Sequence, residues 1–122
     1  MSDRLDQMFE LQNRFNDLVR TKRKLDMDAA TWLQKDALAL MVELGEVVTE
    51  AGYKWWKNSG PIEIEKLHEE LVDVFHFFLS LCIDAGMDAE ALYRGYLAKN
   101  QENFRRQHGL SDKPGYASES VE

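Results

Sequence analysis

Cysteine and proline are scarce in this chain of 122 residues, which contains one cysteine and two prolines. The single cysteine, Cys82, rules out a disulfide framework, and we expect a reducing, cytoplasmic location. Because Cys82 lies in an apolar run, we expect it to be a small core residue. No alternating pattern typical of β-strands is found, and only seven glycines punctuate the sequence. The sequence therefore predicts an all-α fold.

A long hydrophobic run is also missing. The longest nearly apolar stretch covers the thirteen residues 71–83 and contains the ionisable Asp73. A membrane-spanning helix needs about 20 residues. The N-terminal sequence MSDRLDQMFE lacks the basic and then apolar pattern of a signal peptide. We therefore expect residues 71–83 to form a buried helix, and we expect no membrane partner.

Positive charge is in deficit. The chain has 15 lysines and arginines against 22 aspartates and glutamates, for a net charge of −7. A protein that binds DNA or RNA along its backbone would present a basic face, so we expect no nucleic-acid polymer as partner. An acidic protein can still act on a polyphosphate if its carboxylates hold metal ions.

Four helical segments, joined by short connections, are predicted from the spacing of apolar residues. Asp28 and Asp88 are expected N-caps, and Pro61 suits the first turn of the third helix. Short connections favour antiparallel neighbours, as in a four-helix bundle. We expect one domain over residues 1–110, followed by a polar, mobile tail over residues 111–122. The expected helices cover about residues 4–19, 29–56, 61–86 and 89–109.

Two of these helices carry paired carboxylates. The second helix contains ELGE and the third contains EELVD, and residues three apart share one helix face. In antiparallel helices the two pairs would stand at about the same height, and lysines or arginines that could neutralise them are missing there. Carboxylate oxygens favour Mg²⁺ or Mn²⁺, and iron is disfavoured because the second helix has no histidine. A solvated acidic stripe is the alternative. The expected metal ligands are Glu43, Glu46, Glu70 and Asp73.

Cationic and amide side chains occupy single faces of the two outer helices. Lys99, Asn103 and Arg106 fall on one face of the fourth helix, where they suit a phosphate chain held by metal on its other flank. Gln12 and Asn16 stand on an otherwise apolar face of the first helix, and amides in that setting usually have a hydrogen-bonding task. Ordinary surface charge is the alternative for the cations.

An aromatic pair flanked by lysines follows in YKWWK at the expected end of the second helix. Trp56, beside Lys54 and Lys57, could stack on a base while the lysines contact substrate. A core or dimer anchor is an equally good interpretation of the tryptophans.

The ordered set of motifs resembles a known family. ELGE followed by ELVD is similar to the ExxE…ExxD signature of the all-α nucleoside triphosphate pyrophosphatases, the MazG-like superfamily. LQNRFND, YKWWK and KNQENFRRQHG resemble elements of the dimeric dUTP diphosphatases, so that the likeness spans residues 8–109. The sequence lacks the additional helices that many of those enzymes insert, so the resemblance supports the chemistry more than a preference for uracil.

The resemblance implies an activity and roles for individual residues. It implies Mg²⁺-dependent hydrolysis of a deoxynucleoside triphosphate, with dUTP the expected substrate, to the monophosphate and pyrophosphate. Glu46 is the expected catalytic carboxylate that orients or deprotonates the attacking water. The implied metal ligands are Glu43, Glu46, Glu70 and Asp73, the implied phosphate or sugar contacts are Lys99, Asn103 and Arg106, and the implied base pocket contains Gln12, Asn16 and Trp56.

Two alternatives and an oligomeric state complete the expectations. The first alternative is a MazG-type housecleaning pyrophosphatase that acts on dCTP, dATP or damaged nucleotides, and the second is a non-enzymatic helical adaptor. Amides match the edges of uracil and cytosine equally well, so a pyrimidine is favoured over a purine. The third helix is apolar on nearly every side, which predicts cover by a homodimer, and two dimers could pair further.

Overall fold

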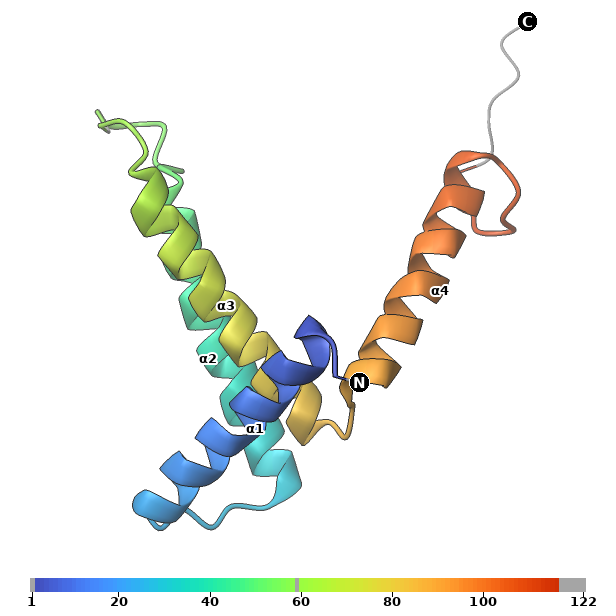
Figure 1. The fold of residues 1–122 in the computed structure, drawn as a ribbon. Helices are drawn as coiled ribbons and strands as arrows, with labels where there is room; N and C mark the ends of the chain where they lie inside the picture. Colours follow the sequence, from blue (N-terminus) through green and yellow to red (C-terminus); the bar gives the residue numbers. More distant parts are fainter. Residues whose placement is uncertain (1, 59, 117–122) are drawn as a thin grey trace, which may run out of the picture. The chain divides into compact units, whose positions relative to one another are not determined.

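The computed structural model describes residues 2–58 and 60–116 and contains, within them, four α-helices and no β-strand (Figure 1). The all-α prediction is confirmed. Among the described residues, none of the helices combines the length and the apolar character needed to cross a membrane. The helices are α1 (Arg4–Lys22), α2 (Ala29–Glu50), α3 (Ile64–Asp84) and α4 (Ala89–Gln107).

Aspartates begin the first two helices. The Asp3 side chain accepts a hydrogen bond from the Asp6 backbone N–H, and the Asp6 side chain accepts one from the Asp3 N–H, which forms a reciprocal capping box. Asp28 Oδ1 lies 2.8 Å from the Thr31 backbone nitrogen, so the predicted N-cap of α2 is confirmed. Hydrogen bonding to Thr31 also holds the pKa of Asp28 below its usual value.

The connection between α2 and α3 is longer than predicted. Helix α2 ends at Glu50, because Gly52 adopts a φ of +71° and its N–H bonds back to the Thr49 carbonyl. Trp56 therefore follows the helix and does not belong to it. Pro61 precedes α3, whose N-cap is Glu63. The predictions of a helical Trp56 and of Pro61 in the first turn were wrong.

The chain forms two compact units that divide between Asp88 and Ala89. In the first unit, α3 packs along α2 and also contacts α1 (Figure 1). Phe9, Leu79 and Cys82 are buried, which confirms Cys82 as a core residue, and burial raises the pKa of its thiol. The second unit contains α4 and the turn after it. The single domain over residues 1–110 stays a prediction, and residues 117–122 of the expected tail lie outside the described residues.

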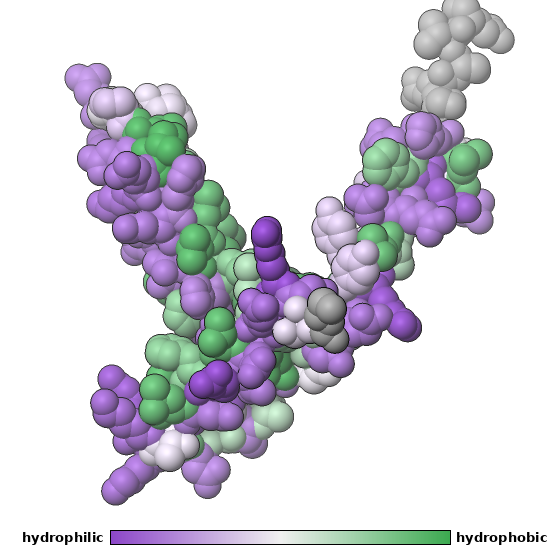
Figure 2. All heavy atoms as spheres, viewed as in Figure 1, coloured by the Kyte–Doolittle hydropathy of each residue, from purple (hydrophilic) through white to green (hydrophobic). Residues whose placement is uncertain are grey.

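Large apolar side chains remain exposed on the first unit. On α2 these include Leu38, Met41 and Val42, and on α3 they include Val72 and Phe75. Figure 2 shows apolar surface along the α2 and α3 pair. Large exposed apolar patches are commonly binding surfaces for another molecule.

Candidate functional site

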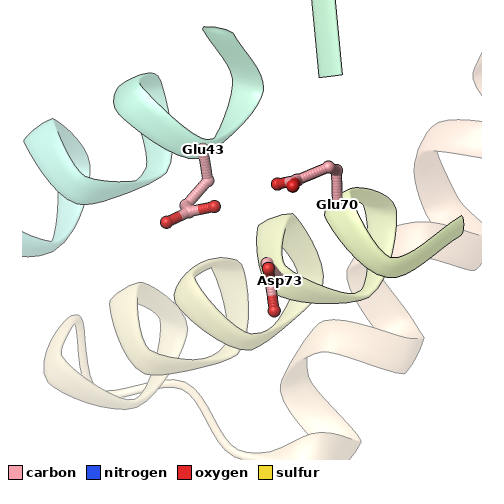
Figure 3. A group of neighbouring side chains, drawn as sticks. All are labelled: Glu43, Glu70 and Asp73. Carbon is pink, nitrogen blue, oxygen red and sulfur yellow. The ribbon is translucent and has the colours of Figure 1, made fainter. Parts of the chain in front are cut away.

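Three of the predicted carboxylates meet between α2 and α3. One oxygen each of Glu43, Glu70 and Asp73 lies within 4.8 Å of the others. Figure 3 shows Glu43 on α2 facing Glu70 on α3, with Asp73 one turn further along α3. The antiparallel packing of the two helices thus brings Glu43 close to residues 27 and 30 positions later in the sequence. We call these three residues the acidic cluster.

The acidic cluster carries uncompensated negative charge. Partial burial raises the pKa of Glu70, and the charges of Asp73 and Glu43 raise it further. Glu43 and Glu70 are half-buried while Asp73 is exposed, so the cluster is shallower than the flanking apolar residues suggested. No lysine or arginine in the described part of the chain forms an ion pair with any of the three. The repulsion favours a bound cation.

The next two acids of α2 differ in their surroundings. Glu46 is exposed and lies outside the acidic cluster, although its charge contributes to the raised pKa of Glu70. Glu50 is paired with Lys66, at 3.2 Å between Oε1 and Nζ. Of these two acids, Glu46 is the one that forms no ion pair among the described residues. Its assignment as a metal ligand and catalytic group stays a prediction.

The acidic cluster fits a hard divalent cation. Its donors are carboxylate oxygens from two rigid helices, without sulfur or imidazole. Mg²⁺ and Mn²⁺ prefer oxygen ligands of this kind and commonly complete their shells with water and substrate phosphates. Three carboxylates that are within 4.8 Å of one another, with no protein cation between them, therefore match the expected Mg²⁺ site.

A cavity of about 910 Å³ opens beside the acidic cluster, among α1, α2 and α3. Its wall is mainly apolar, with Phe15, Trp32 and Phe75 among the lining residues, and Asp73 of the acidic cluster also lines it. A mainly apolar cavity with a few polar groups is the usual form of a small-molecule site. Its further polar lining residues are Gln12, Asn16, Arg20, Asp36, His76 and Ser80.

A continuous chain of hydrogen bonds joins most of those polar residues. Asn16 Nδ2 donates to Ser80 Oγ at 2.9 Å, and Gln12 Nε2 donates to Asn16 Oδ1 at 3.0 Å. His76 Nδ1 lies 2.8 Å from Gln12 Oε1. At the other end, Ser80 Oγ donates to Asp36 Oδ1 at 3.5 Å. The amides of Gln12 and Asn16, which sequence spacing selected, therefore do line a cavity, and we call this series the polar chain.

A carboxyl pair lies at the deep end of the polar chain. Asp36 is 7% exposed, and its Oδ2 receives no hydrogen bond from any described donor. The carboxyl of Asp84 lies within hydrogen-bonding contact, and Arg20 Nη2 bonds Asp84 Oδ2 at 2.7 Å. Burial raises the pKa of Asp36 to about 7, helped by Asp84. Burial opposes ionisation of Asp84 too, but its bonds to Asp36 and Arg20 hold the pKa of Asp84 low.

The YKWWK segment lies in the connection after α2. Trp56 makes edge-on contacts with Tyr53, at 5.9 Å between ring centroids, and with Trp55, at 5.7 Å. Trp56 is 59% exposed, which leaves ring surface for a base or another protein. Lys54 is half-buried and Lys57 is exposed. Among the residues that line the cavity, none comes from this segment, so the roles of Lys54, Trp56 and Lys57 stay predictions.

The predicted phosphate contacts lie on α4, within the second unit. Lys99 and Asn103 are exposed, and Lys99 makes no ion pair among the described residues. Arg106 is half-buried and its Nε lies 3.3 Å from Glu102 Oε1. A hydrogen bond from Ser111, with help from Arg106, keeps the pKa of Glu102 below its usual value. The three residues share a face of α4, and their contacts with substrate stay predictions.

Sequence reasoning missed Asp36, the most deeply buried carboxylate at the cavity. A signal was present, because Leu33 and Leu40 stand three residues before and four after it, on the same helix face. A carboxylate on an apolar helix face indicates a candidate functional residue, and this holds for Asp36 as it does for Asp73. Its partners Arg20 and Asp84 come from two other helices, and only tertiary packing reveals them.

A known family matches most of this chain. The model of the family described as dUTPase (dUTPase_2) matches residues 4–91. That range covers α1, α2 and α3, and with them the acidic cluster and the polar chain. No solved structure matches the chain.

Phage proteins are among its curated relatives. The chain is similar to a dCTP pyrophosphatase of Enterobacteria phage T4, with 32% identity over 104 residues that cover 66% of this chain and 61% of the relative. It is also similar to a dCTP pyrophosphatase of Enterobacteria phage LZ5, with 35% identity over 74 residues that cover 61% of this chain and 43% of the relative. The chain thus spans about three fifths of the first relative and less of the second. On the match over residues 4–91, the chain belongs to the dUTPase_2 family of all-α, MazG-like nucleoside triphosphate pyrophosphatases.

Proposed function

We propose that this protein hydrolyses a deoxynucleoside triphosphate to the monophosphate and pyrophosphate with the help of Mg²⁺. The observation that supports this most directly is the acidic cluster, in which Glu43, Glu70 and Asp73 present oxygens within 4.8 Å of one another. Membership of the dUTPase_2 family supports the same chemistry. An adaptor would have no need for three converging carboxylates beside a mainly apolar cavity.

The preferred nucleotide is dCTP, with dUTP second. The sequence alone favoured dUTP and kept dCTP as an alternative. The similar phage proteins are dCTP pyrophosphatases, which supports the alternative more than the first expectation. The family description, dUTPase, supports a pyrimidine of either kind. A base in the cavity would meet the amides of Gln12 and Asn16.

Each part of the site has a distinct task in this proposal. Glu43, Glu70 and Asp73 would hold the metal ion, which would supply Lewis-acid stabilisation of phosphate charge and make a water more acidic. Glu46 would orient the attacking water and accept its proton at a carboxylate oxygen. Mn²⁺ would substitute for Mg²⁺ because both prefer oxygen ligands.

The remaining proposed contacts bind the substrate. Lys99, whose charge is unpaired among the described residues, offsets the charge of the phosphate chain, and Asn103 and Arg106 contact phosphate or sugar. Trp56 offers ring surface to the base, while Lys54 and Lys57 lie beside it to contact substrate.

A panel of nucleotides tests this function. With Mg²⁺ present, we expect pyrophosphate release to be fastest from dCTP, slower from dUTP, and at least about tenfold slower from dATP and dGTP, because the family description and the phage relatives both favour a pyrimidine. Chelation of the metal should stop the reaction with every nucleotide. Pyrophosphate release from none of the four would support an adaptor, and fastest release from a purine would contradict the assignment of Gln12 and Asn16.

We propose a homodimer as the cover for the exposed apolar face. Leu38, Met41 and Val42 of α2 are 61%, 68% and 64% exposed, and they lie close together on one helix. Exposed apolar surface of that extent is costly in a monomer. A second copy of the chain offers the same face in return, which suits a two-fold interface. Two such dimers could pair through the remaining surface.

Sedimentation equilibrium tests the dimer. We expect twice the 14.2 kDa mass of one chain. Met41→Lys places a charge on the exposed apolar face and should shift the protein towards the monomer, whereas Met41→Leu, which keeps the volume and the apolar character, should not. A wild-type protein that sediments as a single chain would contradict the proposal.

A further inference from the structure

Each hydrogen bond of the polar chain has a defined donor and acceptor, and Asp36 at one end determines which group donates. A carboxylate oxygen accepts hydrogen bonds, and it has no hydrogen to donate. Ser80 must therefore donate its single O–H to Asp36 Oδ1. Its oxygen can then only accept from Asn16, which must turn its Nδ2 towards Ser80. Asn16 Oδ1 in turn faces Gln12 Nε2. The orientation of both amides follows from Asp36.

His76, at the opposite end of the polar chain, does not determine which groups donate. His76 Nδ1 meets Gln12 Oε1 at 2.8 Å. An imidazole nitrogen donates or accepts according to its tautomer, so His76 adopts the Nδ1–H form that Gln12 requires. His76 thus follows the orientation that begins at Asp36.

The protonation state of the carboxyl pair does not reverse the polar chain. Asp84 contacts Asp36, and two carboxyl groups in contact can hydrogen-bond only when one of them carries a proton. Oδ2 of Asp36 receives no other donor, so it is the oxygen that shares a proton with Asp84. Oδ1 stays an acceptor for Ser80 with or without that proton. Arg20, bound to Asp84 at 2.7 Å, keeps the negative charge of the pair on Asp84.

With this orientation each amide keeps one N–H that the polar chain does not use, and both residues line the cavity. Each amide nitrogen has two hydrogens and uses one of them in the polar chain, at Asn16 and at Ser80. No described acceptor takes the second hydrogen of Gln12 Nε2 or of Asn16 Nδ2. Two neighbouring donors suit two adjacent acceptors. Cytosine has adjacent acceptors at O2 and N3, whereas N3 of uracil carries a hydrogen.

We infer that Asp36 is a positioning residue for base selection: through Ser80 it fixes Gln12 and Asn16 as hydrogen-bond donors towards the cavity, and this favours cytosine over uracil. The inference rests on the proposed function in one respect, since it takes the base to lie in the cavity. Asp36 acts through its hydrogen bond with Ser80, and no part of the polar chain belongs to the acidic cluster.

Binding of dCMP and dUMP, measured by titration calorimetry, tests base selection without any need for turnover. We expect wild-type protein to bind dCMP about tenfold more tightly than dUMP. Asp36→Ala removes the hydrogen-bond acceptor for Ser80, and Ser80→Ala removes the link between Asp36 and Asn16. Each substitution should therefore bring the ratio of the dUMP and dCMP dissociation constants close to one. Asp36→Asn should keep the preference, since its amide N–H can bond Asp84 and its oxygen can accept from Ser80. Ser80→Thr keeps the hydroxyl and should keep the preference as well.

Cys82→Ala is the matched control. Cys82 is buried on α3, two residues from Ser80, and lies outside the polar chain. Its replacement lowers stability through lost packing but should leave the ratio unchanged. Ser80→Ala removes a single oxygen, and it tests the loss of the dCMP preference if Asp36→Ala does not fold.

The outcomes separate this inference from the proposed function. A preference for dCMP that survives Ser80→Ala or Asp36→Ala in folded protein would overturn the inference, and so would wild-type protein that binds neither monophosphate. Wild-type protein that prefers dCMP, loses the preference in Ser80→Ala, and releases no pyrophosphate from any nucleotide would support the inference while it removes the proposed activity.

Discussion

Asp73→Asn is expected to lower Mg²⁺-dependent pyrophosphate release on the order of 10³-fold. The substitution keeps the side-chain volume and removes one of the three charges of the acidic cluster. A neutral amide oxygen binds a divalent cation much more weakly than a carboxylate does, because the attraction is largely electrostatic. Initial rates over a range of Mg²⁺ concentrations provide the measurement. Activity close to that of wild type would remove the acidic cluster from the mechanism.

The same variant gives a second result in the absence of nucleotide. The charges of Asp73 and Glu43 help to raise the pKa of Glu70, which shows that the three acids repel one another. Loss of one charge should therefore raise the melting temperature of the metal-free protein. Millimolar Mg²⁺ should raise the melting temperature of wild type by mass action and leave that of Asp73→Asn nearly unchanged.

Glu69→Gln is the matched control for Asp73→Asn. Glu69 is an exposed acid on the same helix, and it lies outside the acidic cluster. Its replacement removes the same unit of charge, so it corrects for the change in net charge. Wild-type response to Mg²⁺ in Glu69→Gln, together with lost response in Asp73→Asn, would assign the effect to the cluster.

Sequence spacing predicted the acidic cluster because the pattern was local. Glu70 and Asp73 share a face of one helix, and α2 and α3 follow one another in the chain and pack side by side, so Glu43 stands close to them. The same reasoning selected Gln12 and Asn16, which stand one turn apart on α1. Periodicity within a helix and the proximity of consecutive helices were therefore enough to predict these two groups of residues.

Features that depend on backbone detail were not predicted. Helix α2 ends at Glu50, six residues before the expected end at about Trp56, and Gly52 follows in the left-handed region. Strongly apolar, aromatic residues such as Trp55 and Trp56 extended the helical pattern past that point. Pro61 fits a first helical turn as readily as the segment before a helix, and the chain uses the second arrangement.

Features that depend on contacts among three helices also could not be predicted. Asp36 lies on α2, Asp84 on α3 and Arg20 on α1. No spacing along the chain relates residues 64 positions apart such as Arg20 and Asp84. The pattern around Asp36 indicates a carboxylate on an apolar face, and only the packing of the three helices shows what neutralises it.

Asp36→Asn is expected to remove most of the dependence of stability on pH between about pH 4 and pH 7. Burial, with the contact from Asp84, raises the pKa of Asp36 from 3.8 to about 7 in the folded protein, against the opposing charge of Arg20. Between these two values the folded protein holds a proton at Asp36 that the unfolded chain has lost. The free energy of unfolding of wild type therefore falls as the pH rises through this window, and the loss is complete above about pH 7.

Asparagine reproduces the protonated form of Asp36 at every pH. Its N–H can donate to Asp84 in place of the shared proton, and its oxygen can accept from Ser80. The variant should therefore be more stable than wild type above about pH 7, by on the order of 2–4 kcal/mol, and close to wild type below about pH 4. Asp84 contributes in the opposite sense in both proteins, because its lowered pKa makes stability fall at still lower pH.

Urea unfolding across this pH range, with Asp26→Asn as the control, measures the effect. Asp26 is exposed in the connection between α1 and α2, so its replacement removes one carboxylate without touching the buried pair. The difference in unfolding free energy between Asp36→Asn and wild type should grow steadily from about pH 4 to pH 7 and then stay constant. Parallel curves for the two proteins would mean that Asp36 is ionised throughout and shares no proton with Asp84. In that case Asp36 Oδ2 would be a buried charge without a donor, which at 7% exposure the fold could maintain only at a large cost in stability.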